Sequence, residues 1–590
     1  MRSRLFWITT SGLLSALLAT PASWGADNTS ARPKVKKGLS PAEARSVLRD
    51  LQELAQAVKA DSKLAGDLRS VERPKRTVTA PKITARDIDQ MLSKHLATEG
   101  AKPVPAADDP EFARRVWLDL TGTLPSPEEV RAFVADTDAR KREKLVERLL
   151  KDENFGRNWA RYWRDAISYH ATVANPRLAD FDSLEAWMTD QFNANRPWDE
   201  MAREMIAGTG DTSENGAVVF TAAHMAQPVE VAGEVSRLFM GVQIQCAQCH
   251  DHPTDPFKRE QFHEFASFFA GTTARRNAKT AKKATGLMVS TRPGKTRYTM
   301  PDLKDPQKSI PIDPKFFLAV EDEIPTSLSA QDRRTLAASY VTGQDNPYFA
   351  RAFVNRVWAA LVGTPFYSPV DDLGPTREGE ATEVLDRLAS EWAAGGYDVK
   401  WLFRTILETQ VYARQTRAST SEAGETPFAA ACPTQLRADQ ILDSLGQALD
   451  LPLDAQNRKN LKKGGNQAAT VRGRGNQVRR LFNAVFGSDP SVPADEVMGT
   501  IPQALFLMNS AQINRAMQAT PQSTLGQILE ENKDDQAAID ALYLRVLARK
   551  PSEAERKTCT DYIATVKDRR EAFEDLLWAL INSAEFISRR

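Results

Sequence analysis

One short segment of the chain has residue types and spacing that can do chemistry, Cys246-Ala247-Gln248-Cys249-His250. This is the CxxCH pattern by which c-type haem is attached to a protein. Two thiols three residues apart can reach both vinyl groups of one porphyrin, and the adjacent imidazole can coordinate its iron. The segment therefore predicts one covalent haem held by Cys246 and Cys249, with His250 as an axial ligand of the iron.

Two other readings of the same segment stay open. Cys246 and Cys249 can form a local disulfide, which would close a short loop and add little stability. Alternatively Cys246, Cys249, His250 and His252 can bind zinc or copper, because all four are acceptable ligands for these metals. Four ligands from seven residues are geometrically cramped, and ordinary zinc sites draw a second ligand pair from a distant segment.

A sixth ligand for a haem iron is not fixed by spacing. His252 is only two residues beyond His250, so both rings can scarcely reach opposite faces of one haem. An open sixth position would bind a small ligand, whereas Met or His there would favour electron transfer. The candidates elsewhere in the chain are His224, Met225, Met240, His263 and Met288.

Other chemical patterns in the sequence lead to no catalytic assignment. The chain contains no HExxH, no GxSxG and no Gly-rich dinucleotide motif. Asp371 and Asp372 could act as paired carboxylates, but adjacent acids in a Pro/Gly-containing stretch usually form turns. Cys432 and Cys559 are interpreted as buried free thiols or a long-range disulfide. The sequence gives no basis for assigning an enzymatic activity.

The first residues indicate the compartment. Residues 1–26 contain Arg2 and Arg4, an apolar run and then small residues, which is the pattern of a secretory signal peptide. Haem attachment takes place outside the cytoplasm in bacteria, so the leader and the CxxCH segment agree. We expect an exported protein of the periplasm or the cell surface, with no membrane span in the mature chain.

Composition excludes several classes of protein. The chain has 590 residues, 42% of them hydrophobic and 26% charged, which is typical of a globular protein large enough for several domains. The formal net charge of +1 becomes −1 once the leader with its two arginines is removed. Such a balance gives no support for a nucleic-acid partner. The basic, Gly-rich stretch from Arg458 to Arg480 lacks interleaved aromatics and is interpreted as a solvated loop rather than a polyanion site.

Hydrophobic periodicity predicts a mainly α fold. Ser126-Pro127-Glu128-Glu129 is a capping box with proline at the first helical position, and the aromatic stripe from Trp159 to Ile167 has helical spacing. We interpret that stripe as core, and His170 after it as a helix-end histidine rather than a ligand. The predicted organisation is a signal peptide at 1–26, a linker with an amphipathic helix at 27–84, a helical domain at 85–270 that carries CxxCH, a basic linker with limited structure at 271–335, and a second helical domain at 336–590.

The chain resembles a planctomycete-type protein with a cytochrome c-like domain of unknown function followed by its usual companion domain, also of unknown function. The segments that carry the first resemblance are Arg114 to Gly122, Leu124-Pro125, Phe155-Gly156, Trp159 to Arg161, Trp163, Asp165, Tyr169, and Phe239 to Pro256 around CxxCHDHP. Those that carry the second are Asn346-Pro347, Phe349 to Arg351, Asn355 to Trp358, Asp371 to Pro375, Tyr412, Pro502 to Ser510, Trp578, Asn582-Ser583 and Glu585-Phe586.

The resemblance implies a role that rests on the haem-attachment-like motif. Cys246, Cys249, His250, Asp251, His252 and Pro253 match that motif. Many similar proteins carry a separate cytochrome c domain ahead of these two, whereas this chain has no second CxxCH. The resemblance further implies an exported redox or scaffold partner encoded nearby. Two classes of function are therefore expected, an exported electron-transfer or small-ligand-binding haem protein and an exported helical scaffold or surface-binding protein without redox function.

Overall fold

The computed structural model describes residues 78–589 apart from 175–177, 277–285, 294–295, 306, 320–323, 326, 418–424, 452–478 and 493–499. The predicted signal peptide, the helix predicted within 27–84 and nearly all of the basic stretch from Arg458 to Arg480 lie outside these residues. The described chain is mainly helical, as predicted. No helix among the described residues combines the length and the apolar character needed to cross a bilayer.

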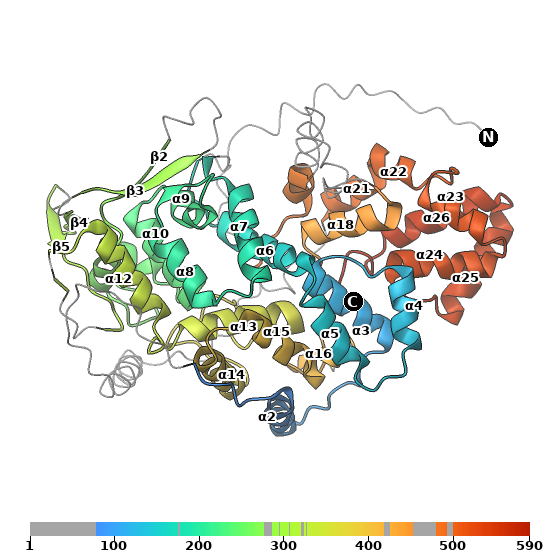
Figure 1. Cartoon of the computed structure of the whole chain (residues 1–590), viewed down its shortest axis with the longest axis horizontal. Helices are drawn as coiled ribbons and strands as arrows, with labels where there is room; N and C mark the ends of the chain where they lie inside the picture. The colour runs from blue at the N-terminus through green and yellow to red at the C-terminus, as the bar shows by residue number, and fades with distance from the viewer. Residues whose placement is uncertain are drawn as a thin grey trace.

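The first half of the chain is a series of helices joined by short loops (Figure 1). They are α2 (Ala85–Thr98), α3 (Asp109–Thr121), α4 (Pro127–Ala135), α5 (Lys141–Leu149), α6 (Glu153–Ser168), α7 (Phe181–Asn193), α8 (Trp198–Ala207), α9 (Val219–Ala223), α10 (Pro228–Val235) and α11 (Arg259–Ser267). Shorter turns are the 3₁₀ segments η2 (Gly216–Val218) and η4 (Gln245–Gln248) and the π-helical η3 (Ser236–Met240).

Local sequence explains where several of these helices begin. α4 starts at the predicted capping box, in which Ser126 Oγ accepts the Glu129 N–H and Glu129 accepts the Ser126 N–H. The aromatic stripe of α6 is buried, with Trp163 and Ile167 fully enclosed. The interpretation of this stripe as core is therefore confirmed.

Residues 271–335 were predicted to be a linker with limited structure, but the described residues of this range form four strands. These are β2 (Thr272–Arg276), β3 (Leu287–Thr291), β4 (Tyr298–Pro301) and β5 (Ser309–Ile312), and β1 (Gly210–Asp211) joins β3 and β2 in an antiparallel sheet. Ala274, Leu287 and Val289 pack against Ala222 of α9. Only Thr272 and Ala274 of β2 are buried and two arginines follow them, so its strand pattern is weak in the sequence.

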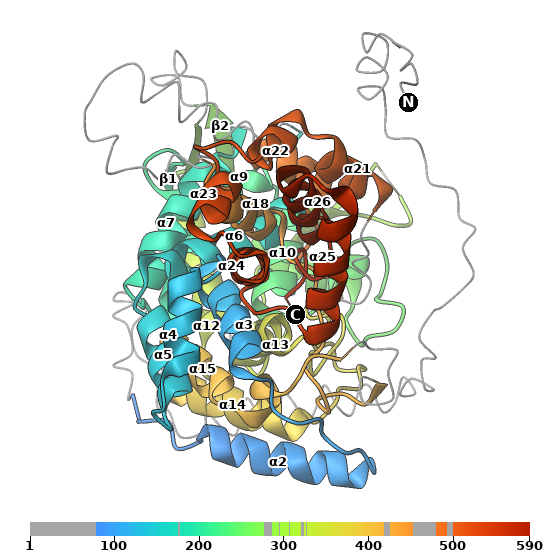
Figure 2. The same ribbon diagram turned by 90° about the vertical axis from the view of Figure 1, so that its right-hand side faces the viewer.

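The second half of the chain is helical again. Its first helices are α12 (Ala330–Thr342), α13 (Phe349–Val362), α14 (Thr382–Ala394), α15 (Val399–Leu407) and α16 (Gln410–Ala413). The later ones are α18 (Ala438–Leu449), α21 (Ile501–Asn509), α22 (Ala511–Ala516), α23 (Thr524–Glu531), α24 (Asp535–Leu547), α25 (Glu553–Val566) and α26 (Arg569–Ile581). Figures 1 and 2 show α23 to α26 gathered at the end of the molecule opposite the strands.

Two main hydrophobic cores divide the described chain near residue 430. The first runs from Ile83 to Phe428 and so takes in α12 to α16 together with α2 to α11. The second is built by α18 and α21 to α26, and Leu118 and Leu124 from the N-terminal half join it. We call these the first and second lobes. The lobes therefore divide the chain at a different place from the predicted linker at 271–335.

A candidate cysteine-histidine site where two segments meet

The CxxCH segment forms one short turn on the surface of the first lobe. Cys246 lies in η4, Cys249 follows directly, and both thiols are exposed and unpaired. Ala247 between them is fully buried and anchors the turn to the lobe. Both thiols and the exposed His250 are thus presented outward from a fixed base. Cys246 and Cys249 do not form a disulfide in this structure.

The His250 ring is held in one orientation by its own loop. His250 Nδ1 lies 2.7 Å from the Asp251 carbonyl oxygen, to which it donates a hydrogen bond. Histidines that bind metals usually donate one ring N–H to a carbonyl or carboxylate, which leaves the other nitrogen free to coordinate. His250 Nε2 has that freedom, since no partner for it occurs among the described residues. The two thiols and this imidazole fit the requirements of covalent haem attachment.

His252 points the other way and builds the loop. Its side chain is only 5% exposed, and Nδ1 accepts the backbone N–H of Asp255 at 2.9 Å. Burial lowers the pKa of His252, which favours the neutral ring that can accept this bond. Within the described parts of the chain, no group of three or more His, Cys, Asp or Glu side chains is arranged to hold a metal ion.

A second histidine supports the turn from below. His263 of α11 donates from Nε2 to the Gln248 carbonyl at 3.0 Å, and Nδ1 accepts from the Tyr298 hydroxyl at 2.7 Å. Burial lowers the pKa of His263 and raises that of Tyr298 to about 12, so both groups are neutral near pH 7. His263, considered as a sixth ligand from sequence, is thus engaged through both ring nitrogens.

The loop from Pro369 to Arg377 contacts the residues that flank CxxCH through a backbone hydrogen bond and an ion pair. The Leu373 N–H donates to the Gly241 carbonyl at 2.6 Å, and Arg377 Nη2 lies 3.2 Å from Asp255 Oδ2. Thr376 also donates to Asp255, whose side chain is only 3% exposed. A segment more than a hundred residues away in sequence therefore completes the site.

Asp371 and Asp372, considered from sequence as paired carboxylates, each pair with arginine instead. Asp371 lies against Arg237 and is 3.6 Å from Arg356, whereas Asp372 is 2.7 Å from Arg377. The two carboxylates thus form ion pairs with different arginines instead of acting together as a pair. In this structure the pair positions the loop, as expected for acids in a turn.

The buried Arg237 connects the loop of Asp371 to α6 and α10 through its hydrogen bonds. It lies in the π-helical turn η3, a local geometry that is frequent at functional sites. It donates to Glu234, Asp371, the Ala166 carbonyl and Ser491 Oγ, and these carboxylates raise its pKa despite burial. The CxxCH segment thus follows directly on a buried charge network that joins α6, α10 and the loop of Asp371.

The remaining residues singled out from sequence are placed apart from this turn's exposed face. His224 is 1% exposed, and both its ring nitrogens are buried without a hydrogen-bond partner in the described chain. Met240 is buried and accepts from Asn346, and Met288 lies in β3. His170 follows α6 and bonds Asp489 at 2.7 Å, as a helix-end residue. Cys432 and Cys559 are free thiols beside Thr364 and Tyr543 respectively.

The supporting roles of the residues around the turn could not be read from sequence, where His263 was only a candidate haem ligand, because they depend on contacts with distant segments. His263, Tyr298, Asp255, Arg377 and Arg237 belong to no spacing pattern. The available signal was the resemblance itself, which covers both the CxxCHDHP segment and Asp371 to Pro375.

Comparison with known protein families agrees with the finding that two distant segments of the chain form the site. Residues 87–274 match the model of the family PSCyt2, described as a protein of unknown function (DUF1549), and residues 332–563 match PSD1, described as a protein of unknown function (DUF1553). No curated protein and no solved structure matches the chain. The Cys-His turn lies in the first matched region and the loop that grips it lies in the second. The chain therefore belongs to the planctomycete-type family in which these two domains of unknown function follow one another.

Proposed function

We propose that this chain is an exported, c-type cytochrome-like protein that carries one covalent haem. Cys246 and Cys249 hold the porphyrin through thioether bonds, and His250 Nε2 coordinates the iron. When bound, the haem supplies one-electron redox chemistry or a site for a small ligand. The observation that carries the proposal is the outward presentation of two reduced thiols and one oriented imidazole on a single anchored turn.

The rest of the chain contributes rigidity to that turn. Ala247, His252 and His263 fix the backbone on the lobe side, and Asp255 with Arg377 fixes it on the loop side. Because the three haem-binding residues are exposed, a haem here has an edge open to solvent, as transfer to a second exported protein requires. His252 belongs to the support, which counts against the alternative zinc or copper site.

Expression with the haem-attachment machinery tests the proposal. We expect the denatured, purified protein to give a pyridine haemochrome band and the mass increment of one haem. The double variant Cys246→Ala, Cys249→Ala should lose both signals. The matched control is Cys432→Ala, Cys559→Ala, which removes the other two cysteines and should keep both signals.

A negative result would also be informative. Absence of the band and of the mass increment from the wild-type protein would overturn the proposal and leave the scaffold or surface-binding reading. A free-thiol count and metal analysis would then separate a disulfide from a zinc or copper site. For the loaded protein, carbon monoxide added after reduction shifts the absorption spectrum only if the sixth position of the iron is open.

A further inference from the structure

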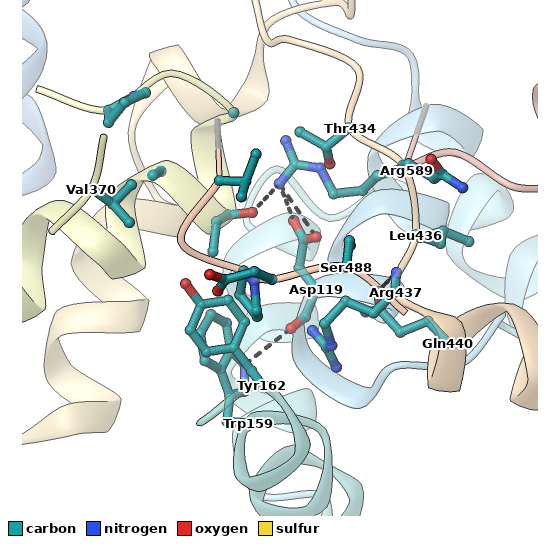
Figure 3. A pocket seen from close by; sticks show the side chains of 18 residues that line it. Asp119, Trp159, Tyr162, Val370, Thr434, Leu436, Arg437, Gln440, Ser488 and Arg589 are labelled. Atoms are coloured by element: carbon teal, nitrogen blue, oxygen red, sulfur yellow. Dashed lines mark hydrogen bonds and ion pairs between the residues drawn. The ribbon is translucent and has the colours of Figure 1, made fainter. Parts of the chain in front are cut away.

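A second feature of the molecule is a cavity between the two lobes, away from the exposed face of the CxxCH turn. Its volume is about 120 Å³, and Asp119, Trp159 and Tyr162 from α3 and α6 form one side. The residues Thr434 to Arg437, Ser488 and Arg589 form another side, together with Val370. Figure 3 shows Asp119 between Arg589 and Trp159. Six segments that are far apart in sequence thus share one hollow.

The charges that line the cavity are already neutralised by partners in the protein. Asp119 is 3.2 Å from Arg589 Nη1 and accepts the Tyr412 hydroxyl at 2.8 Å. Arg437 pairs with Asp439, and Asp489 bonds His170. Because the lining carries two carboxylates, Asp119 and Asp489, and two guanidinium groups, Arg437 and Arg589, its charges cancel and leave no surplus to attract an ionic ligand.

Several polar groups around the cavity nevertheless lack hydrogen-bond partners among the described residues. The hydroxyls of Thr434 and Ser488 have no hydrogen-bond partner among the described residues. Arg589 Nε and Gln435 Oε1, on lining residues, are buried and also lack one in that part of the chain. Leaving a buried polar atom unpaired costs roughly 1–3 kcal/mol, so each such atom calls for a partner. Arg589 Nε and Gln435 Oε1 are too enclosed to be reached from the cavity, whereas water or a ligand there can supply partners for the Thr434 and Ser488 hydroxyls.

The remaining wall is apolar. Trp159, Tyr162, Pro365, Val370 and Leu436 all line the cavity. Small-molecule sites typically combine such walls with a few polar groups that fix the orientation of the ligand. For comparison of size, an engineered cavity of about 150 Å³ takes up benzene. The space therefore suits a ring of five or six atoms whose substituents reach the rim.

We infer that this inter-lobe cavity binds a small, neutral, hydroxylated ring compound. The balanced charges exclude an ion, the unpaired hydroxyl groups exclude a wholly apolar molecule, and the volume limits the size. The ring lies against the apolar wall, while its hydroxyl groups exchange hydrogen bonds with Thr434 and Ser488. This site needs no haem, so it stands independently of the proposed function.

Saturation-transfer NMR on the full chain tests the inference with four probes. Two are neutral and hydroxylated, cis-cyclohexane-1,2-diol and D-xylose, and the other two are the anion cyclohexanecarboxylate and the apolar benzene. We expect transfer to a neutral hydroxylated probe, and at most weak transfer to the anion and to benzene. Thr434→Val keeps the shape of the side chain and removes its hydroxyl, so it should weaken binding of the neutral probe roughly threefold to tenfold.

A variant that fills the cavity provides a second, independent test that the probe binds there. Ala359→Leu on α13 inserts three carbons into the cavity and should abolish transfer, whereas Ala554→Leu on the exposed face of α25 should not change it. Near-UV circular dichroism establishes that each variant is folded. Transfer to no probe would mean that the cavity holds water only, and equal transfer to the anion or to benzene would mean that the ligand class is wrong. Either result overturns the inference.

Discussion

Two histidines of the CxxCHDHP segment have different roles although they are two residues apart. His250 is exposed and donates to its neighbour's carbonyl, whereas the His252 side chain is 5% exposed and accepts the Asp255 N–H. Sequence alone treats both as ligands, because imidazole chemistry is the same in either place. Burial separates them, since a ring enclosed by its own loop cannot turn toward a cofactor outside that loop.

Asp255 provides a test of how the loop is held. Asp255→Ala removes the acceptor for Thr376 and Arg377 while Arg377 keeps Asp372. We expect the free energy of unfolding to fall by about 2 kcal/mol, as for loss of a buried charged hydrogen bond. Hydrogen exchange measured by mass spectrometry should become faster in residues 241–258.

The matched control lies in the same loop. Asp251 pairs with Lys258 at 57% and 62% side-chain exposure and accepts the Arg259 N–H at 3.0 Å, so Asp251→Ala should lower stability by about 1 kcal/mol, less than Asp255→Ala. If both variants exchanged equally fast, Asp255 would have no special part in fixing the CxxCH turn.

The sequence located the candidate site but not the residues that support it. CxxCH is a pattern within five residues, so it can be read directly. Arg237, His263 and Arg377 reach the turn from three different segments, and no local rule relates them. Asp371 and Asp372 were noticed, and their role as turn-forming acids was favoured, yet their arginine partners could not be named from sequence.

At the scale of elements, a helix could be predicted where its capping residues and its hydrophobic periodicity both lie within one short stretch of sequence. The capping box at Ser126 and the stripe of α6 appear as expected. The close approach of α6 and α7 is less visible, because it depends on Gly156. A Cβ there would lie 2.4 Å from the Thr189 carbonyl oxygen, so any larger residue would force the two helices apart. The strands of residues 271–335 were missed because they are short and bury few side chains, two each in β2 and β3 and one each in β4 and β5.

The packing of α6 on α7 should make stability depend on acid pH. Glu185 of α7 lies 2.9 Å from Arg161 and 2.5 Å from Arg164 of α6. Burial would raise its pKa, but the two arginines outweigh burial and lower the pKa from 4.5 to about 2. A depressed carboxyl pKa contributes stability above pH 4.5, and that stability is lost as pH falls toward 2. The contribution at pH 6 is at most about 3 kcal/mol.

Glu185→Gln isolates this contribution. The difference in unfolding free energy between wild type and variant, from urea denaturation followed by tryptophan fluorescence, should shrink by more than half between pH 6 and pH 3. Glu143→Gln on α5 is the control, because Glu143 and its partner Arg140 are 54% and 70% exposed. A Glu185 difference that stays constant over this range would contradict a depressed pKa.

At the scale of the whole molecule, the two matched domains share one hydrophobic core. Trp163 of the first domain stacks on Phe353 of the second at a ring-centroid distance of 5.5 Å, and Trp198 packs on the same ring in a tilted arrangement at 4.5 Å. Phe353 in turn stacks on Trp392 at 4.7 Å. The first lobe therefore needs residues from both matched regions. Sequence similarity marked the regions correctly, but core membership depends on contacts between helices that periodicity cannot pair.

Division of the chain at two places tests this view. Fragment 78–325 ends between the matched regions, whereas fragment 78–432 ends after the first core is complete. Fragment 78–325 should lack near-UV circular dichroism and cooperative unfolding, because Trp163 and Trp198 lose their aromatic partners. Fragment 78–432 should keep both, at a lower melting temperature than the full chain, because Leu118 and Leu124 lose the second core.

Co-expression provides the complementary measurement. Fragments 78–325 and 326–589 produced together should associate and restore the near-UV spectrum, since the aromatic surfaces that each exposes alone are complementary. The CxxCH turn depends on the same association, because Arg377 and Leu373 come from the second fragment. Cooperative unfolding of 78–325 alone, with a native near-UV spectrum, would show instead that the first matched domain folds by itself and that its contacts with α13 and α14 are only docking contacts.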